Sequence, residues 1–278
     1  MKSPFEWIKQ QSKKFADHLF LIDSDQKITY AENFERVQLL MANLQDIVKP
    51  GSKIVFFGNS SIESYQLYYA VIALQGVWFP IDSRLDYNEI LKPILGQINP
   101  DCIIYEKTTK EIIYKLNKDY EKLKFEEIFN SLDAEAVILN ELYDNTADRI
   151  ISAYLTSGST ERPKVVGHGW YATVYHAKST VNRYPLGVDT RLFNPRPLFG
   201  VSGAFPLITL MSCGGSIVIP NSTSYQKNHE NFMVNWAKLI AEQPKLKASS
   251  LRRITTGGEA LEFSELIKIA RAFVTYKL

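Results

Sequence analysis

The stretch Thr156-Ser157-Gly158-Ser159-Thr160-Glu161-Arg162-Pro163-Lys164 directly follows an apolar segment at residues 150–155. The apolar segment predicts a strand, so this stretch is a loop at the end of that strand. Its small hydroxyl side chains donate hydrogen bonds without bulk, and Gly158 allows backbone amides to turn toward an anion. Lys164 adds a point charge that can reach phosphate oxygens. The loop therefore predicts a polyphosphate site, with a polar surface turn as the alternative; it is not a Walker loop, because no Gly-Lys-Ser/Thr sequence follows.

Outward from this loop, strand and helix patterns alternate along the chain. Strand patterns lie at residues 28–30, 54–57, 78–79, 102–105 and 150–155, and helical patterns at residues 31–44, 61–76 and 230–242. Ser60 or Ser61 can cap the second helix, and Gly76 is expected to end it. The charged residues 107–129 favour a surface helix. This alternation predicts an α/β fold with layered subdomains around largely parallel sheets.

Composition excludes some classes of function. The 278 residues carry a formal net charge of +2, which gives no basic footprint for nucleic acid. Residues 199–219 are apolar and uncharged, but Pro206 and the Gly214-Gly215 pair divide them, which favours a buried helix and a buried strand over a membrane span. Cys102 and Cys213 match no metal spacing, so we expect reduced thiols in a cytoplasmic protein.

The order of residues in the loop, followed by His168, closely resembles the signature loop of the adenylate-forming superfamily. That superfamily includes acyl- and aryl-CoA synthetases, luciferases and the adenylation domains of peptide synthetases. Four further segments resemble the superfamily's motifs and occur in its order: residues 28–32, residues 70–82 with Gly76, Pro80 and Asp82, residues 197–203, and residues 251–261. The ordered set is far more specific than any one motif.

The resemblance implies an acyl-CoA-synthetase-like N-terminal domain, with one α/β subdomain at residues 1–148 and a second at 149–278. It implies a ligase that uses ATP and Mg²⁺ to convert a small carboxylic acid into an acyl-adenylate. The phosphate and catalytic residues implied are Thr156, Ser157, Gly158, Ser159, Thr160 and Lys164, with Thr156 and Lys164 catalytic. Gly257, Gly258 and Glu259 would lie against the nucleotide, and His168, Phe199, Gly200 and Gly203 would line the acid pocket.

The residues near Phe199 narrow the class of acid. Relatives that activate amino acids carry an aspartate where this chain has Gly200, and a buried ammonium without a partner is costly. We therefore expect a fatty, aryl or other small organic acid. The acceptor of the acyl group is either CoA or the thiol of a carrier protein.

Three features depart from the superfamily pattern. Glu161 stands where the loop normally has glycine, residues 220–257 form a short interval, and the sequence ends at Leu278 before the motifs of the C-terminal lid domain. We therefore expect weak or no catalysis by this chain alone. It is either a truncated copy or one half of a split enzyme that a C-terminal chain complements. The alternatives are a non-catalytic nucleotide-, acid- or protein-binding member of the same fold and a gene remnant without a role.

Overall fold

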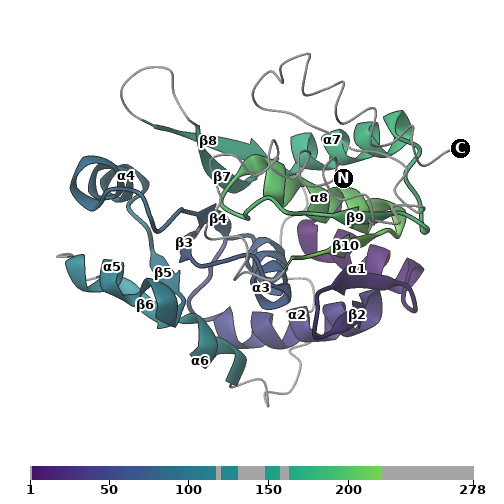
Figure 1. Ribbon diagram of the computed structural model, residues 1–278, viewed down its shortest axis with the longest axis horizontal. Helices are drawn as coiled ribbons and strands as arrows, with labels where there is room; N and C mark the ends of the chain where they lie inside the picture. Colours follow the sequence, from purple (N-terminus) through teal and green to yellow (C-terminus); the bar gives the residue numbers. More distant parts are fainter. Residues whose placement is uncertain (1, 117–119, 131–147, 157–162, 221–278) are drawn as a thin grey trace, which may run out of the picture. The chain divides into compact units, whose positions relative to one another are not determined.

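The computed structural model describes residues 2–116, 120–130, 148–156 and 163–220, which belong to one compact unit, Met1–Ser222. Figure 1 shows its helices and strands. In chain order these are α1 (Pro4–Lys14), β1 (Leu19–Ile22), β2 (Lys27–Thr29), α2 (Tyr30–Leu44), β3 (Lys53–Phe57), α3 (Ile62–Ala73), β4 (Val77–Pro80), the π-helix η1 (Tyr87–Leu91), α4 (Lys92–Ile98), β5 (Cys102–Tyr105), the 3₁₀-helix η2 (Lys107–Thr109), α5 (Lys110–Lys115), β6 (Glu121–Lys124), α6 (Phe125–Asn130), β7 (Ile150–Thr156), β8 (Lys164–Gly169), α7 (Trp170–Arg183), β9 (Arg191–Phe193), α8 (Val201–Cys213) and β10 (Ser216–Val218).

In the part of the chain that the structure describes, the larger sheet has six strands in the order β6-β5-β3-β4-β7-β8. All neighbouring strands are parallel except β7 and β8, which form an antiparallel pair. The central strand β3 is buried on both faces: Ile54 and Phe56 pack into one hydrophobic cluster, and Val55 and Phe57 into another. The prediction of a largely parallel α/β fold is confirmed.

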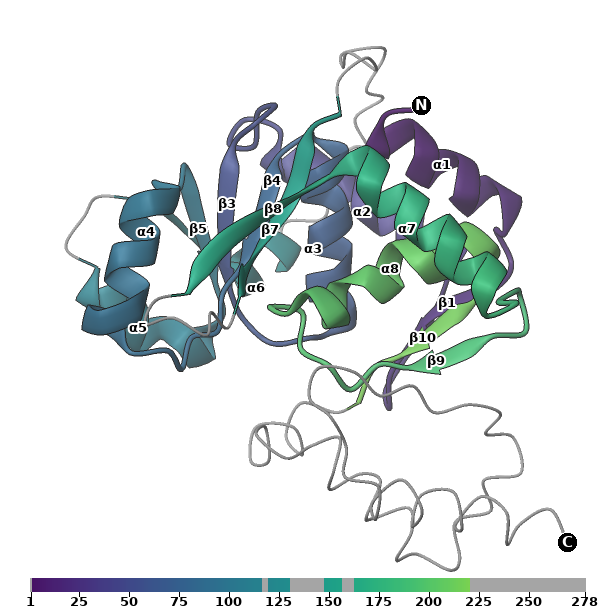
Figure 2. The same cartoon turned by 90° about the horizontal axis from the view of Figure 1, so that it is seen from above.

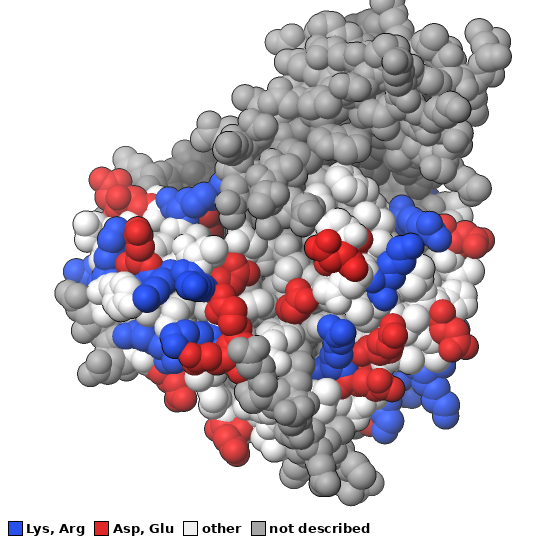
Figure 3. Space-filling view, turned by 60° about the horizontal axis from the view of Figure 1, so that its bottom comes forward, with Lys and Arg blue, Asp and Glu red and all other residues white. Residues whose placement is uncertain are grey.

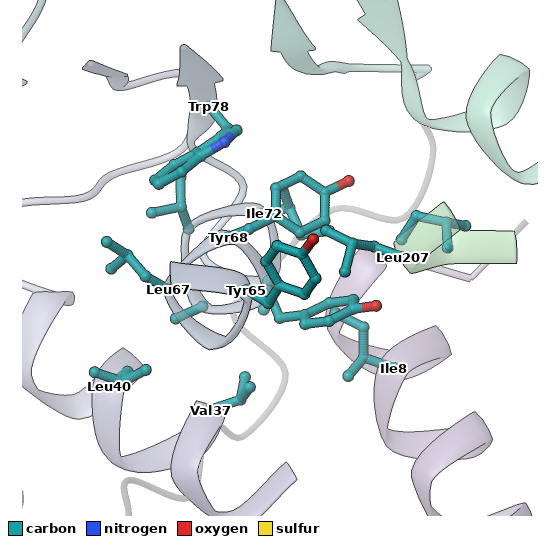
Figure 4. Close-up of a cluster of buried hydrophobic side chains, with 14 of the residues drawn as sticks. Ile8, Val37, Leu40, Tyr65, Leu67, Tyr68, Ile72, Trp78 and Leu207 are labelled. Atoms are coloured by element: carbon teal, nitrogen blue, oxygen red, sulfur yellow. The ribbon is translucent and has the colours of Figure 1, made fainter. Parts of the chain in front are cut away.

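Helices cover both faces of this sheet, with α2 and α3 on one side and α4 on the other (Figure 2). Ser61 caps α3 through a reciprocal pair of hydrogen bonds with Ser64, as the serine pattern predicted. Every residue of α3 except Glu63 is buried. Figure 4 shows Tyr65 and Tyr68 of this helix among side chains from α1, α2 and α8.

The smaller sheet has the order β2-β1-β10-β9 and joins the two ends of the described chain. Leu21 of β1 pairs in parallel with Ile217 of β10. Helix α8 packs against β10, α7 and α1. The predicted buried helix and buried strand after residue 199 are therefore α8 and β10, with Pro206 inside the helix rather than at a break.

Two predictions about local structure are wrong. Residues 107–129 do not form one surface helix, because β6 lies among them at the edge of the larger sheet. Helix α3 ends at Ala73, and the left-handed residue after it is Gln75 (φ 61°), not Gly76. The glycine is still required there, because a Cβ atom at Gly76 would lie 2.7 Å from a methyl group of Val48.

The cysteines, the apolar helices and the surface charges were the other subjects of the sequence predictions. Cys102 is buried and Cys213 half-buried, and both are free thiols. Among the described residues no helix is long and apolar enough to cross a membrane. On the face shown in Figure 3, Lys and Arg side chains are interspersed with Asp and Glu side chains. The predicted helix at residues 230–242 and the boundary between subdomains at residue 148 remain predictions, the helix lying outside the described residues.

Candidate active site

The strands on either side of the predicted phosphate loop form the hairpin β7–β8. Thr156 is the last residue of β7 and Lys164 the first of β8, and the two are partners in the antiparallel register. The hydroxyl of Thr156 lies 3.5 Å from the carbonyl oxygen of Lys164, and both residues are exposed. Because β7 runs parallel to β4, Thr156 lies on the side of the sheet where β3, β4 and β5 have their carboxyl ends. We call this side the carboxyl edge, and it is where open α/β sheets bind their ligands.

Several of the predicted site residues lie outside the described residues. These are Ser157, Gly158, Ser159, Thr160, Gly257, Gly258 and Glu259; Glu161, the departure from the loop pattern, lies outside them too. The described part of the site therefore consists of Thr156 and Lys164 at the hairpin, His168 on β8, and the segment that contains Phe199, Gly200 and Gly203.

His168 lies on β8, two residues before α7 begins, and is half-buried between aromatic rings. Its imidazole is edge-on to the ring of Tyr154 at 5.5 Å and to the ring of Phe205 at 5.3 Å, measured between centroids. The ring of His176 lies 4.6 Å from that of Phe205. Burial, and secondarily the nearby His176, lowers the pKa of His168 below its ordinary value, which favours the neutral imidazole.

Gly200 and Gly203 occupy the first turn of α8, and only Gly203 is sterically required there. Gly200 is the N-cap of α8 with φ −105°, and a Cβ atom there would lie 3.7 Å from the nearest atom, the carbonyl oxygen of Pro197. A Cβ atom at Gly203 would lie only 2.0 Å from that same oxygen. Glycine at position 203 therefore lets the helix approach the backbone of the preceding turn. Phe205 of the same helix contacts His168, so the structure brings β8 and the start of α8 together.

Sequence reasoning missed Arg84, whose guanidinium lies over the ring of Phe199 at 5.7 Å from the ring centroid. The same guanidinium donates two hydrogen bonds, of 2.8 and 2.7 Å, to the carboxylate of Asp82. Asp82 follows β4 at the carboxyl edge, so the pair joins this edge to the segment before α8. The motif that contains Asp82 was the available signal, but nothing in it indicated an ion pair with Arg84.

Sequence reasoning also missed a set of hydrogen bonds on either side of Phe199 in the chain. The backbone N–H of Leu198 donates to the hydroxyl of Ser60 at 2.9 Å. The amide of Asn194 donates to the hydroxyl of Tyr65 at 3.1 Å and to the carbonyl of Gly203 at 2.8 Å. Burial raises the pKa of Tyr65 to about 12, so its hydroxyl is neutral and can serve as donor or acceptor.

Comparison with known proteins identifies the family to which this chain belongs. The family model described as "AMP-binding enzyme" matches residues 8–275. Among curated relatives, the polyketide synthase-nonribosomal peptide synthetase ACE1 of Pyricularia oryzae is 25% identical over 77% of this chain, and bacitracin synthase 2 of Bacillus licheniformis is 23% identical over 78%. The match spans only 5% and 8% of the lengths of these relatives.

Among solved structures, the N-terminal domain of FACL13 from Mycobacterium tuberculosis is 18% identical, with a TM-score of 0.83. The match covers 98% of this chain and 74% of that domain, and it supports the fold. The chain belongs to the AMP-binding enzyme family. The family predicted from the motifs is confirmed.

Proposed function

We propose that this chain supplies the phosphate-binding and acid-binding parts of an ATP-dependent ligase that converts a carboxylic acid into an acyl-adenylate. One observation carries the proposal: Thr156 and Lys164 are register partners at the carboxyl edge of the larger sheet. The family supports the use of a nucleotide. The hydroxyl and the ammonium of these two residues are suited to phosphate oxygens.

The proposed reaction is an in-line displacement at the α-phosphorus of ATP. A carboxylate oxygen of the acid forms a bond to phosphorus, and the bond from that phosphorus to the bridging oxygen breaks. Pyrophosphate leaves with the electron pair. The acid reacts as its anion, so no side chain has to remove a proton. Thr156 would donate a hydrogen bond to a phosphate oxygen and Lys164 would neutralise charge on the leaving group, so catalysis rests on positioning and electrostatics.

Within the residues that the structure describes, no group of three or more His, Cys, Asp or Glu side chains is placed to hold a metal ion. Mg²⁺ commonly binds through substrate phosphates with few protein ligands, so we propose that it arrives with ATP. We derive no step of the reaction from it.

The neighbours of His168 favour an acid without an ammonium group. Among the residues that the structure describes, the rings of Tyr154 and Phe205 contact the imidazole and His176 contacts Phe205, and none of these three side chains is a carboxylate. The carboxylate of Asp82, near Phe199, is already bound by Arg84. We therefore propose a fatty, aryl or other small organic acid, with CoA or a carrier-protein thiol as the acceptor. A cytoplasmic location stays a prediction from the sequence.

Binding of ATP with Mg²⁺, measured by calorimetry, tests the proposal. We expect the wild-type chain to bind and Lys164→Ala to bind about tenfold more weakly or worse, because a charge-assisted contact is lost. Lys178→Ala is the matched control, since Lys178 is an exposed lysine on α7. Failure of the wild-type chain to bind ATP would overturn the proposed function.

A second measurement tests the expectation that this chain alone is a weak catalyst. ATP–pyrophosphate exchange with a panel of acids should stay at background for the purified chain. ATP binding without exchange fits either half of a split ligase or the non-catalytic alternative. Addition of a C-terminal lid domain separates these two, because only the split ligase should then gain exchange. Robust exchange by the chain alone would show that the expected incompleteness is wrong.

A further inference from the structure

Glu106 lies between two neighbouring strands of the larger sheet whose connecting helices pack on opposite faces of that sheet. β3 and β5 are neighbouring parallel strands, but the chain leaves β3 toward α3 on one face and reaches β5 through α4 on the other. Glu106 is the first residue after β5 and is half-buried at the carboxyl edge between these strands. In doubly wound sheets such a switch point usually receives a ligand. Here a carboxylate of the protein itself lies there.

The carboxylate of Glu106 holds the loop that follows β3. One oxygen accepts a hydrogen bond of 2.9 Å from the backbone N–H of Asn59, and the other accepts one of 2.8 Å from the side-chain amide of Asn59. Thr108 donates a third, at 3.2 Å. A Cβ atom at Gly58 would lie 2.8 Å from the first oxygen, so glycine there allows the carboxylate to reach the backbone. The orientation of Asn59 is thus fixed from two sides.

The next residue carries this constraint to the predicted acid pocket. Ser60 accepts the hydrogen bond from the backbone N–H of Leu198, directly before Phe199. Tyr65 also bonds to Ser60, and it accepts from Asn194, which in turn binds the carbonyl of Gly203. Both ends of residues 198–203, which we call the pocket segment, are therefore tied to the loop after β3 and to the start of α3.

We propose that Glu106 is a positioning residue for the acid site: it fixes Asn59, and through Ser60 it holds the pocket segment. The link to acid binding rests on the proposed function, but the mechanical link does not. The side chain of Glu106 contacts Asn59 and Thr108. In this proposal its effect reaches residue 198 through the backbone of residues 59 and 60.

Hydrogen–deuterium exchange of a peptide covering residues 195–205 tests the mechanical link without any ligand. In Glu106→Gln one carboxylate oxygen becomes an NH₂ group, which faces a donor of Asn59 instead of accepting from it. We expect exchange in this peptide to become about tenfold faster, because local opening no longer has to break a charge-assisted bond. Unchanged exchange would overturn the proposal.

A swap of donor and acceptor separates positioning from general destabilisation. In the double variant Asn59→Asp with Glu106→Gln, the amide of residue 106 can accept from the backbone N–H of residue 59 and donate to its new carboxylate. We expect exchange at residues 195–205 to return to the wild-type rate. Ser60→Ala should speed exchange there with Glu106 intact, which keeps the test decisive if Glu106→Gln folds poorly. Failure of the swap to slow exchange, or no effect of Ser60→Ala, would contradict the proposal.

Asp101 offers a matched control on the same two strands. Its carboxylate accepts a hydrogen bond of 2.7 Å from the backbone N–H of Lys53. It therefore joins β5 to β3 at the amino ends of these strands, opposite the carboxyl edge. Asp101→Asn should leave the exchange rate at residues 195–205 unchanged. An increase in that rate as large as the one in Glu106→Gln would contradict the proposal. ATP calorimetry on the same proteins distinguishes the two claims. If the wild-type chain does not bind ATP, the proposed function is wrong. If exchange at residues 195–205 is not faster in Glu106→Gln, the role of Glu106 is wrong.

Discussion

The hydroxyl of Tyr30 lies 2.8 Å from the carbonyl oxygen of Leu210, a residue 180 positions later in the chain. It also lies 2.7 Å from the carbonyl oxygen of Gly215, so one side chain of α2 binds the end of α8 and the turn after it. Burial raises the pKa of Tyr30 well above its ordinary range, which keeps the hydroxyl protonated as a donor. The first and last parts of the described chain are thus joined by a buried polar contact.

Tyr30→Phe should therefore destabilise the fold without leaving a large cavity. The hydroxyl has one proton to share between the two carbonyl groups, and Leu210 keeps the backbone N–H of Gly215 as a partner, so the change chiefly removes the hydroxyl donor from the carbonyl of Gly215. The expected loss is about 1–3 kcal/mol of unfolding free energy. Urea denaturation followed by fluorescence measures it. Tyr114→Phe is the control, because Tyr114 is 72% exposed. Equal stabilities of Tyr30→Phe and the wild type would contradict this role.

The two glycines of the predicted acid pocket should respond differently to alanine. Gly203→Ala places a methyl group against the carbonyl of Pro197 and should cost about 3 kcal/mol of stability, since backbone must move. Gly200→Ala meets only ordinary contact distances and should change stability by less than about 0.5 kcal/mol. Thermal denaturation of the pair checks this. Equal melting temperatures for the two variants would show that the close approach at Gly203 is wrong.

His168 should make the fold more stable as pH rises through the range just below the ordinary histidine pKa. Its pKa is lowered in the folded state, chiefly by burial, so the unfolded chain binds the proton more readily there. Stability should fall as pH drops below about 6.5, and His168→Gln should remove part of that slope. Urea midpoints between pH 5 and pH 8 report it. His176→Gln should keep most of the slope, because burial is the larger cause, and an unchanged slope in His168→Gln would refute the assignment.

Glu106 should have the opposite pH dependence. Burial raises the pKa of its carboxyl, with a smaller contribution from Glu126, while the hydrogen bonds from Asn59 and Thr108 oppose the rise. The folded chain therefore binds the proton more readily, and stability falls as pH rises from about 4.3, the ordinary glutamate value, through the raised pKa. Glu106→Gln should lack this decline when urea midpoints are compared over that range. A pH-independent difference between the two proteins would contradict the prediction.

Parts of the fold could be predicted because local chemistry determines them. The run Ile54-Val55-Phe56-Phe57 has no polar face, so it had to be a strand covered on both sides, and Ser61 could cap only a helix that starts after it. β6 escaped prediction because a charged edge strand has no apolar pattern and is held by pairing with β5.

The supports of the candidate site could not be predicted, since they join residues that are distant in sequence. Ser60 and Leu198 are 138 positions apart, and hydrogen bonds between loops leave no periodic trace. Arg84 was missed for a related reason: its stacking on Phe199 depends on how two separate turns meet at the carboxyl edge. Motif order predicted the family and led to the proposal of Thr156 and Lys164, whereas the packing around Phe199 depends on contacts between distant loops.

The pairing of β1 with β10 has a consequence for biosynthesis. Ser216 donates a 2.7 Å hydrogen bond to the carbonyl of Leu19, 197 positions earlier. A ribosome adds ~5–20 residues per second, so the first strand waits roughly 10 to 40 seconds for its neighbour to be translated. Until then its apolar residues Phe20 and Leu21, both fully buried in the finished fold, lack that cover and are open to chaperones or to other nascent chains.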